Sequence, residues 1–179
     1  RDADVFKCSL KAFQIIKSKI NCKLKIIGSF TPSIESELMN WKKENNFDSN
    51  ELEILGKLSF QELPQAISIC DVMLFLKAGD SCPNGILESM SCGLPVVCNE
   101  WGGSKELVGD AGIVIKDSKC LYDDKLANDA AVAILSILDK IDYFSLKARK
   151  RVEKYFTLDR MVNDYMNIFL KTDNIEERL

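Results

Sequence analysis

The chain has 179 residues, of which 46% are hydrophobic, and this suits a single domain with a sizeable core. Its 24 basic and 27 acidic side chains give a net charge of -3, which argues against a protein that binds nucleic acid by neutralising phosphates. The chain contains no histidine, so Ser-His-Asp triads, histidine general bases and histidine-ligated metals are excluded.

Targeting signals are missing from the printed sequence. No apolar run approaches the length of a membrane span, and no signal peptide pattern is present. The seven cysteines are odd in number and form no C-x-x-C pair, so we interpret most of them as reduced, buried side chains of a cytoplasmic protein. The first residue is Arg1 rather than methionine, and we expect the chain to be part of a longer protein.

Helix-like and strand-like segments alternate along the chain. Helices are predicted at 4–20, 31–45, 64–69, 83–92, 123–141, 143–154 and 158–171, and strands at 24–28, 51–55, 71–77, 94–98 and 112–115. This alternation predicts an α/β fold, a Rossmann-like parallel sheet with helices on both faces, over residues 1–171, followed by a polar tail at 172–179. Ligands of such sheets bind at the carboxyl ends of the strands.

The most informative stretch of the sequence is 80–103, DSCPNGILESMSCGLPVVCNEWGG. It begins in the loop after the apolar segment 71–77, which reads as a buried strand. Ser81 or Cys82 is predicted to cap the following helix, whose first turn would contain Pro83. The stretch therefore places a helix start at the carboxyl end of a buried strand.

This helix start is suited to an anion. The N–H groups of Asn84, Gly85 and Ile86 are expected to be free and to point toward the crevice, where the helix dipole favours negative charge. Glu88 follows Asn84 by one turn and shares its face. Together with Asp80, it would grip hydroxyl-rich parts of a ligand on either side of a phosphate.

The spacing alone leaves a second interpretation open, in which the two carboxylates are a helix-start acid and a solvated surface residue. The surrounding sequence decides between the two. Residues 80–103 resemble the retaining GT-B glycosyltransferases of the large group-one family, whose signature is E-x7-E. The match runs through ILESMSCGLPVV at 86–97 and continues with Gly102-Gly103 and with ELV at 106–108.

The resemblance extends over about residues 1–170. Further segments similar to the family's are Arg1–Phe13, Ile26–Gly28, Leu55–Gly56, Glu62–Pro64, Cys70–Val72 and Gly109–Gly112. It implies the C-terminal, donor-binding half of a GT-B enzyme that transfers a sugar from a nucleoside diphosphate sugar to a saccharide or lipid-linked acceptor with retention. This role fits polysaccharide biosynthesis.

The resemblance also implies roles for individual residues. Glu88 would bind the ribose hydroxyls, and Asp80 would contact the transferred sugar, although Asp is one methylene shorter than the family's Glu. The backbone around Asn84, Gly85 and Ile86 would surround the diphosphate and sugar.

The stretch with Leu58, Phe60 and Leu63 would line the base pocket. None of these three is a carboxylate that could pair with guanine, which favours UDP or ADP over GDP. Arg1 stands where one of two basic residues stabilises the leaving diphosphate, and the other would precede residue 1. The predicted donor-binding residues are Arg1, Gly28, Leu58, Phe60, Leu63, Asp80, Ser81, Cys82, Pro83, Asn84, Gly85, Ile86 and Glu88.

The same resemblance limits the activity that we expect of this domain without the rest of the enzyme. It implies no metal, no cofactor besides the donor, and no catalytic acid or base among these residues. The acceptor-binding N-terminal domain is the expected partner, and without it we expect poor donor binding and little or no transfer.

Other interpretations remain open. A non-catalytic nucleotide-sugar-binding or regulatory module is the alternative function, supported by Asp in place of Glu at position 80. A phosphorylase or epimerase of the same architecture is a third, without a matching cofactor motif. The basic run at 147–151 reads as a solvated face, or else as a membrane-surface patch near a lipid-linked acceptor.

Overall fold

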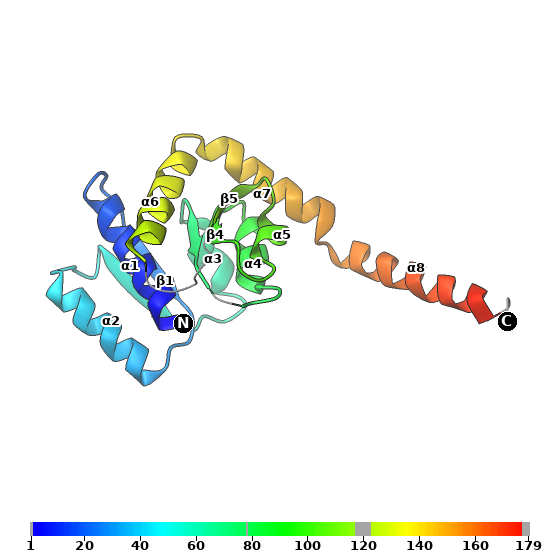
Figure 1. Ribbon diagram of the computed structural model, residues 1–179, viewed down its shortest axis with the longest axis horizontal. Helices are drawn as coiled ribbons and strands as arrows, with labels where there is room; N and C mark the ends of the chain where they lie inside the picture. The colour runs from blue at the N-terminus through cyan, green and yellow to red at the C-terminus, as the bar shows by residue number, and fades with distance from the viewer. Residues whose placement is uncertain (1, 78, 117–122, 177–179) are drawn as a thin grey trace.

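The structure is a computed structural model that describes residues 2–77, 79–116 and 123–176 (Figure 1). The elements in chain order are α1 (Asp2–Lys17), β1 (Leu24–Ile27), α2 (Pro32–Glu44), β2 (Leu52–Gly56), α3 (Leu63–Ser68), β3 (Met73–Phe75), α4 (Asn84–Ser91), β4 (Val96–Asn99), α5 (Ser104–Val108), β5 (Gly112–Ile115), α6 (Asp124–Leu138), α7 (Ile141–Tyr155) and α8 (Leu158–Glu176). The predicted alternation of helices and strands is confirmed.

The strands pair in parallel, but in two groups rather than in one continuous sheet. Strand β1 pairs with β2, and the second sheet has the order β3-β4-β5. The predicted class, an α/β fold with parallel strands flanked by helices, is therefore confirmed, while the expected single sheet is divided within the described residues.

Both faces of the three-stranded sheet are covered, as the apolar segment at 71–77 predicts. Side chains alternate in direction along a strand. In β3, Leu74 therefore packs into a cluster with α1 and α6, while Met73 and Phe75 face a second cluster with α4, α5 and α7. Val97 and Val96 of β4 divide between the two clusters in the same way.

The two-stranded sheet has its own core against α1 and α2. Leu10, Ile26, Leu38 and Leu52 are buried together there. Helix α2 begins as the sequence predicts, since the Thr31 hydroxyl accepts from the Ile34 amide and a proline occupies the first turn.

The structure differs from the predicted elements at several ends. Helix α5 has no predicted counterpart, because five residues are too few to show a helical period. Strand β3 covers only the centre of the predicted 71–77 strand. Helix α8 continues to Glu176 instead of ending at 171.

Two residues of the basic run on α7 contact α5 and the turn after it. Arg151 donates from Nε to the Leu107 carbonyl at 2.7 Å and from Nη2 to the Glu106 carbonyl at 2.7 Å, so it caps the last turn of α5. Lys147 forms an ion pair with Asp110 at 2.6 Å. The solvated-face interpretation of this run is therefore wrong for these two side chains, which join α7 to α5 and the turn after it.

Helix α8 extends away from the rest of the molecule (Figure 1). Its apolar side chains are exposed, and at helical periodicity most of them fall on one side of the helix. The side chains on that side are Leu158, Met161, Val162, Tyr165, Met166, Ile168 and Phe169. We call this set the apolar face of α8. None of the helices in the described part of the chain combines the length and apolar character needed to cross a membrane.

The contacts of Arg151 lead to a stability prediction. Arg151→Ala leaves two carbonyls at the end of α5 without their charged donor, and this should lower the free energy of unfolding by about 1.5–3 kcal/mol. Lys150→Ala removes a neighbouring exposed charge and should change it by less than about 0.5 kcal/mol. Urea denaturation of the two variants measures the difference, and equal effects would contradict the capping role.

Candidate functional site

Two loops meet at the carboxyl edge of the three-stranded sheet. One follows β3 and leads to α4, and the other follows β4 and leads to α5. Because β3 and β4 are parallel neighbours, both loops leave the sheet on the same side. This edge is where the sequence predicts a ligand.

Asp80 organises the first loop. Its Oδ1 accepts from the Cys82 amide at 3.2 Å, and its Oδ2 lies 3.3 Å from Nζ of Lys77. The Asp80 side chain is partly buried, with 29% of its surface exposed. The carboxylate is thus fixed at the edge of the sheet while a part of it stays accessible.

The second loop lies directly against the first. The Gly103 amide donates to the Asp80 carbonyl at 2.9 Å. Asn99 at the end of β4 is fully buried, and its Oδ1 accepts from the Lys77 amide at 3.2 Å. The position of Asp80 therefore depends on residues 99–103 as well as on its own loop.

The start of α4 differs from the prediction. Pro83, in an extended conformation, is the residue before the helix, and no side chain caps it, so the predicted cap by Ser81 or Cys82 is wrong. The physical reason is that a residue before proline is disfavoured in the helical region, which keeps Cys82 out of the helix. Both Ser81 and Cys82 are exposed instead.

The free amides at this helix start are fewer than predicted. The Ile86 amide donates to the Pro83 carbonyl at 3.1 Å, so the expectation that it is free is wrong. The amides of Asn84 and Gly85 have no acceptor within the described part of the chain. These two N–H groups are what the helix start offers to an anion.

Glu88 lies one turn beyond Asn84 and is partly buried. Its carboxylate has no hydrogen-bond or ion-pair partner among the described residues. On the adjacent side of the helix, Ile86 and Met90 are fully buried in the core. The helix is therefore rigidly seated, and Glu88 is held near the surface with its oxygens available.

The remaining predicted residues are not joined to this edge by any contact. Over the described ranges, no hydrogen bond, ion pair or ring contact connects Gly28, Leu58, Phe60 or Leu63 to the 80–88 segment. Phe60 is 81% exposed on the loop before α3, while Leu58 and Leu63 are partly buried. Arg1 lies outside the described residues.

The loop with Phe60 is nevertheless ordered by its own sequence. The Ser59 hydroxyl donates to Glu62 at 2.6 Å, and the Ser59 amide donates to the same carboxylate at 2.9 Å. These two hydrogen bonds lower the pKa of Glu62, the hydroxyl contributing most. With the Glu62 amide donating back to the Ser59 hydroxyl at 3.3 Å, the two residues form a capping box before α3.

The cysteines differ in exposure along one short segment. Cys82 is exposed in the first loop, and Cys92 is exposed at the opposite end of α4. Cys98 is buried in β4, where desolvation raises the pKa of its thiol to about 12. Of the described cysteines, only Cys8 and Cys98 are buried, so the prediction that most of them are buried is wrong, and Cys120 lies outside the described residues. Among the described residues, no three His, Cys, Asp or Glu side chains group together as a metal site.

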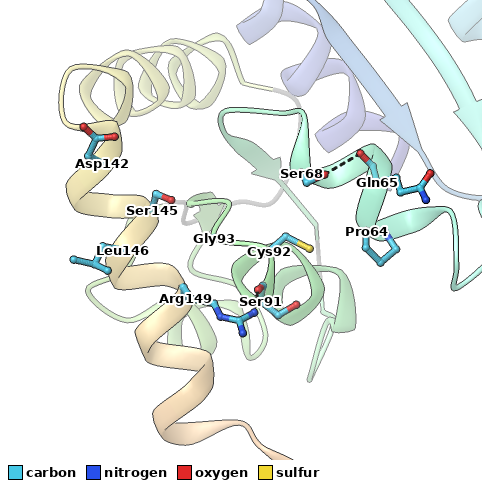
Figure 2. A pocket seen from close by; sticks show the side chains of 10 residues that line it. All are labelled: Pro64, Gln65, Ser68, Ser91, Cys92, Gly93, Asp142, Ser145, Leu146 and Arg149. Atoms are coloured by element: carbon cyan, nitrogen blue, oxygen red, sulfur yellow. Dashed lines mark hydrogen bonds between the residues drawn. The ribbon is translucent and has the colours of Figure 1, made fainter.

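A hollow of ≈ 720 Å³ lies at the far end of α4, away from Asn84 (Figure 2). It is lined by Pro64, Gln65, Ser68, Ser91, Cys92, Gly93, Asp142, Ser145, Leu146 and Arg149. None of these is a predicted site residue. The Arg149 guanidinium, seen in Figure 2, donates to the Ser91 carbonyl and so closes the end of the helix.

Sequence reasoning did not assign Lys77, Asn99, Gly102 or Gly103 to the site. The signals were present, since a lysine three residues before an aspartate can form an ion pair, and a glycine pair after a strand suggests close backbone approach. What the sequence could not supply was the pairing of β3 with β4 that brings the two loops together.

The chain is similar in sequence to known proteins. Residues 3–140 match the family described as glycosyl transferases group 1. The O-antigen chain mannosyltransferase B of Escherichia coli is 28% identical over 105 residues, which cover 59% of this chain and 28% of that protein. The N-acetyl-alpha-D-glucosaminyl L-malate synthase of Bacillus anthracis is 25% identical over 162 residues, which cover 89% of this chain and 40% of that protein. The chain thus spans less than half the length of either relative.

Solved structures show the same fold. The pneumococcal O-GlcNAc transferase GtfA, in complex with UDP and GlcNAc, superposes with a TM-score of 0.74 at 16% identity, over 93% of this chain and 33% of that one. Anabaena HepE in complex with UDP-glucose gives a TM-score of 0.72 at 20% identity, over 94% of this chain and 45% of that one. The fold is that of GT-B glycosyltransferases. With a family match over more than half of its length, the chain belongs to the glycosyl transferases group 1 family.

Proposed function

We propose that this chain is the donor-binding, C-terminal part of a glycosyltransferase that moves a sugar from a nucleoside diphosphate sugar to a saccharide or lipid-linked acceptor with retention. The observation that carries the proposal is the start of α4. There, two amides without an acceptor in the described ranges lie at the carboxyl edge of the sheet, with Asp80 before them and Glu88 after them.

The helix start would bind the diphosphate. The Asn84 and Gly85 amides supply two donors, and the α4 dipole adds about 0.3–1 kcal/mol for an anion at an exposed site. Gly85 presents no side chain that would hold a phosphate away from the backbone. Because the amide dipoles and the positive end of the helix dipole would stabilise the negative charge, we invoke neither a metal nor a further cofactor.

The two carboxylates would grip the parts of the donor on either side of the diphosphate. Glu88, whose oxygens have no partner among the described residues, would accept from the ribose hydroxyls. Asp80 would accept from the transferred sugar, since Lys77 and the Cys82 amide use only two of about four acceptor positions of its carboxylate.

The base would stack on the loop before α3. Phe60 offers an exposed ring, with Leu58 and Leu63 beside it in sequence, and none of the three carries a group that selects guanine. We therefore favour a UDP-sugar, which agrees with the UDP and UDP-glucose in the structures of GtfA and HepE. Gly28 at the end of β1 and Arg1 would complete this side of the site.

The acceptor would be held by an N-terminal domain, and the reaction would take place in the cytoplasm. The two curated relatives are more than twice as long as the part matched here, which leaves room for such a domain. The apolar face of α8 is a surface that another domain of the same chain could cover. The mannosyltransferase relative supports a saccharide product.

The first prediction from this proposal concerns Glu88. In the full-length protein, Glu88→Ala should weaken UDP binding about ten- to hundred-fold, because hydrogen bonds to a charged group contribute about 1.5–3 kcal/mol. Glu35→Ala, an exposed carboxylate on α2, should leave affinity unchanged. Isothermal titration calorimetry with UDP measures both. Absence of UDP, ADP and GDP binding at millimolar concentration would overturn the donor function.

A second prediction uses the two exposed cysteines of α4 and its leading loop. Bound UDP-glucose at ten times its dissociation constant should slow alkylation of Cys82 by N-ethylmaleimide about ten-fold, because only the free protein reacts. Cys92, at the other end of the helix, is the internal control and should keep its rate. Peptide mass spectrometry follows both thiols, and Cys98 should remain unmodified because it is buried with a raised pKa. Equal slowing at Cys82 and Cys92 would contradict a donor site at the helix start.

A third prediction tests the apolar face of α8. Tyr165→Lys and Phe169→Lys should destabilise the full-length protein by about 1–3 kcal/mol each, because each charge would enter a contact with the N-terminal domain. Asn163→Lys and Asn167→Lys lie on the opposite side of the helix and should have effects below about 0.5 kcal/mol. Thermal unfolding compares the four variants. Equal destabilisation by substitutions on the two sides of α8 would count against the N-terminal domain as the partner. A dimer of the full-length protein in light scattering that the Tyr165→Lys and Phe169→Lys variants dissociate would also count against it.

A further inference from the structure

The glycine pair after β4 packs against the backbone of the loop after β3. A Cβ placed on Gly102 would lie 2.0 Å from the Asp80 carbonyl oxygen, and one on Gly103 would lie 2.0 Å from the Ser81 carbonyl oxygen. Real Cβ atoms essentially never approach another atom within 3.0 Å. The obstacles here are backbone atoms, so no side-chain rotation can relieve the clash.

Hydrogen bonds hold the two loops in this contact. The Gly103 amide donates to the Asp80 carbonyl at 2.9 Å, and fully buried Asn99 accepts from the Lys77 amide at 3.2 Å. The Cys82 amide in turn donates to Oδ1 of Asp80. The backbone of the loop is therefore fixed on both sides of Asp80 by the loop that follows β4.

We infer that Gly102 and Gly103 are positioning residues of the donor site, which set where Asp80 meets the transferred sugar. This inference rests on the proposed function. A methyl group at either position would displace the loop by about 1 Å, and a misplacement of that size can reduce the effectiveness of a site by about a hundred-fold. The two glycines thus act through Asp80 and need not touch the donor themselves.

The displacement should affect the sugar more than the nucleotide. Helix α4 is anchored by Ile86 and Met90, which are fully buried, so the position of Glu88 does not depend on the glycine pair. Asp80 lies in the loop that would move. A glycine variant is therefore expected to lose discrimination between UDP-sugar and UDP while keeping its affinity for UDP.

Gly103→Ala is the cleaner variant, because Gly103 has φ -85° and ψ 0°, a conformation open to alanine. Calorimetry on the full-length protein would give the dissociation constants of UDP and UDP-glucose. In Gly103→Ala, we expect the dissociation constant of UDP to change less than about two-fold and that of UDP-glucose to rise about ten-fold or more. Asp80→Ala should show the same pattern, and the double variant should be no weaker than Asp80→Ala alone.

Gly93→Ala is the matched control for stability. Gly93 has φ +79° at the far end of α4, where a Cβ would meet only the Ser145 side chain at 3.3 Å and its carbonyl oxygen at 3.9 Å. This variant is strained like Gly102→Ala but lies away from the loops. It should lower the melting temperature and leave the ratio of the two dissociation constants unchanged.

Each outcome decides the inference. A wild-type protein that binds neither UDP nor UDP-glucose overturns the proposed function and this inference with it. A wild-type protein that binds both, with an unchanged ratio in Gly103→Ala, overturns the inference alone. If Gly103→Ala does not fold, amide hydrogen exchange of the wild-type protein decides: slower exchange at Lys77, Cys82 and Gly103 than at Ser81 supports the contact between the loops, and equal exchange overturns it.

Discussion

The candidate site depends on the register between β3 and β4. Met73 pairs with Val96 and Phe75 pairs with Cys98, and the same offset along the chain brings Asp80 to Gly103 beyond the ends of the strands. Parallel strands present their carboxyl ends at one edge. This register therefore fixes which residues of the two loops meet, and how many residues beyond the end of each strand they lie. A shift of one residue would put other backbone groups opposite the glycine pair.

The helix that begins at this edge is fixed by apolar contacts rather than by a cap. Gly85 lies against the Met73 side chain, whose Cε would be 3.6 Å from an added Cβ, and Ile86 is fully buried one residue later. A side-chain cap would satisfy the first amides of α4 and so remove the groups that an anion needs. The uncapped start at Pro83 and the buried Ile86 together give an anchored helix end whose first two amides have no acceptor among the described residues.

The sequence was sufficient for the class of fold and for most element positions, because apolar periodicity and the Gly, Pro and Ser/Thr signals are local. Local signals also predicted the start of α2. They failed at the start of α4, where the conformational effect of Pro83 on Cys82 overrode the preference of Ser81 for a cap position. They did not reveal the contact between Asp80 and Gly103, since tertiary pairing creates it.

The two ends of α4 explain why the hollow at its far end is not where the chemistry is expected. At the carboxyl end, Gly93 has a left-handed conformation and the Arg149 guanidinium bonds the Ser91 carbonyl, so groups that a ligand could use are already paired. At the amino end, the Asn84 and Gly85 amides and the Glu88 carboxylate have no partner in the described part of the chain. Leaving polar groups unpaired near a core costs stability, and a fold keeps such groups where a ligand can satisfy them. By this argument, unsatisfied donors and acceptors are better evidence of a binding site in this protein than concavity, and they lie at the carboxyl edge of β3 and β4.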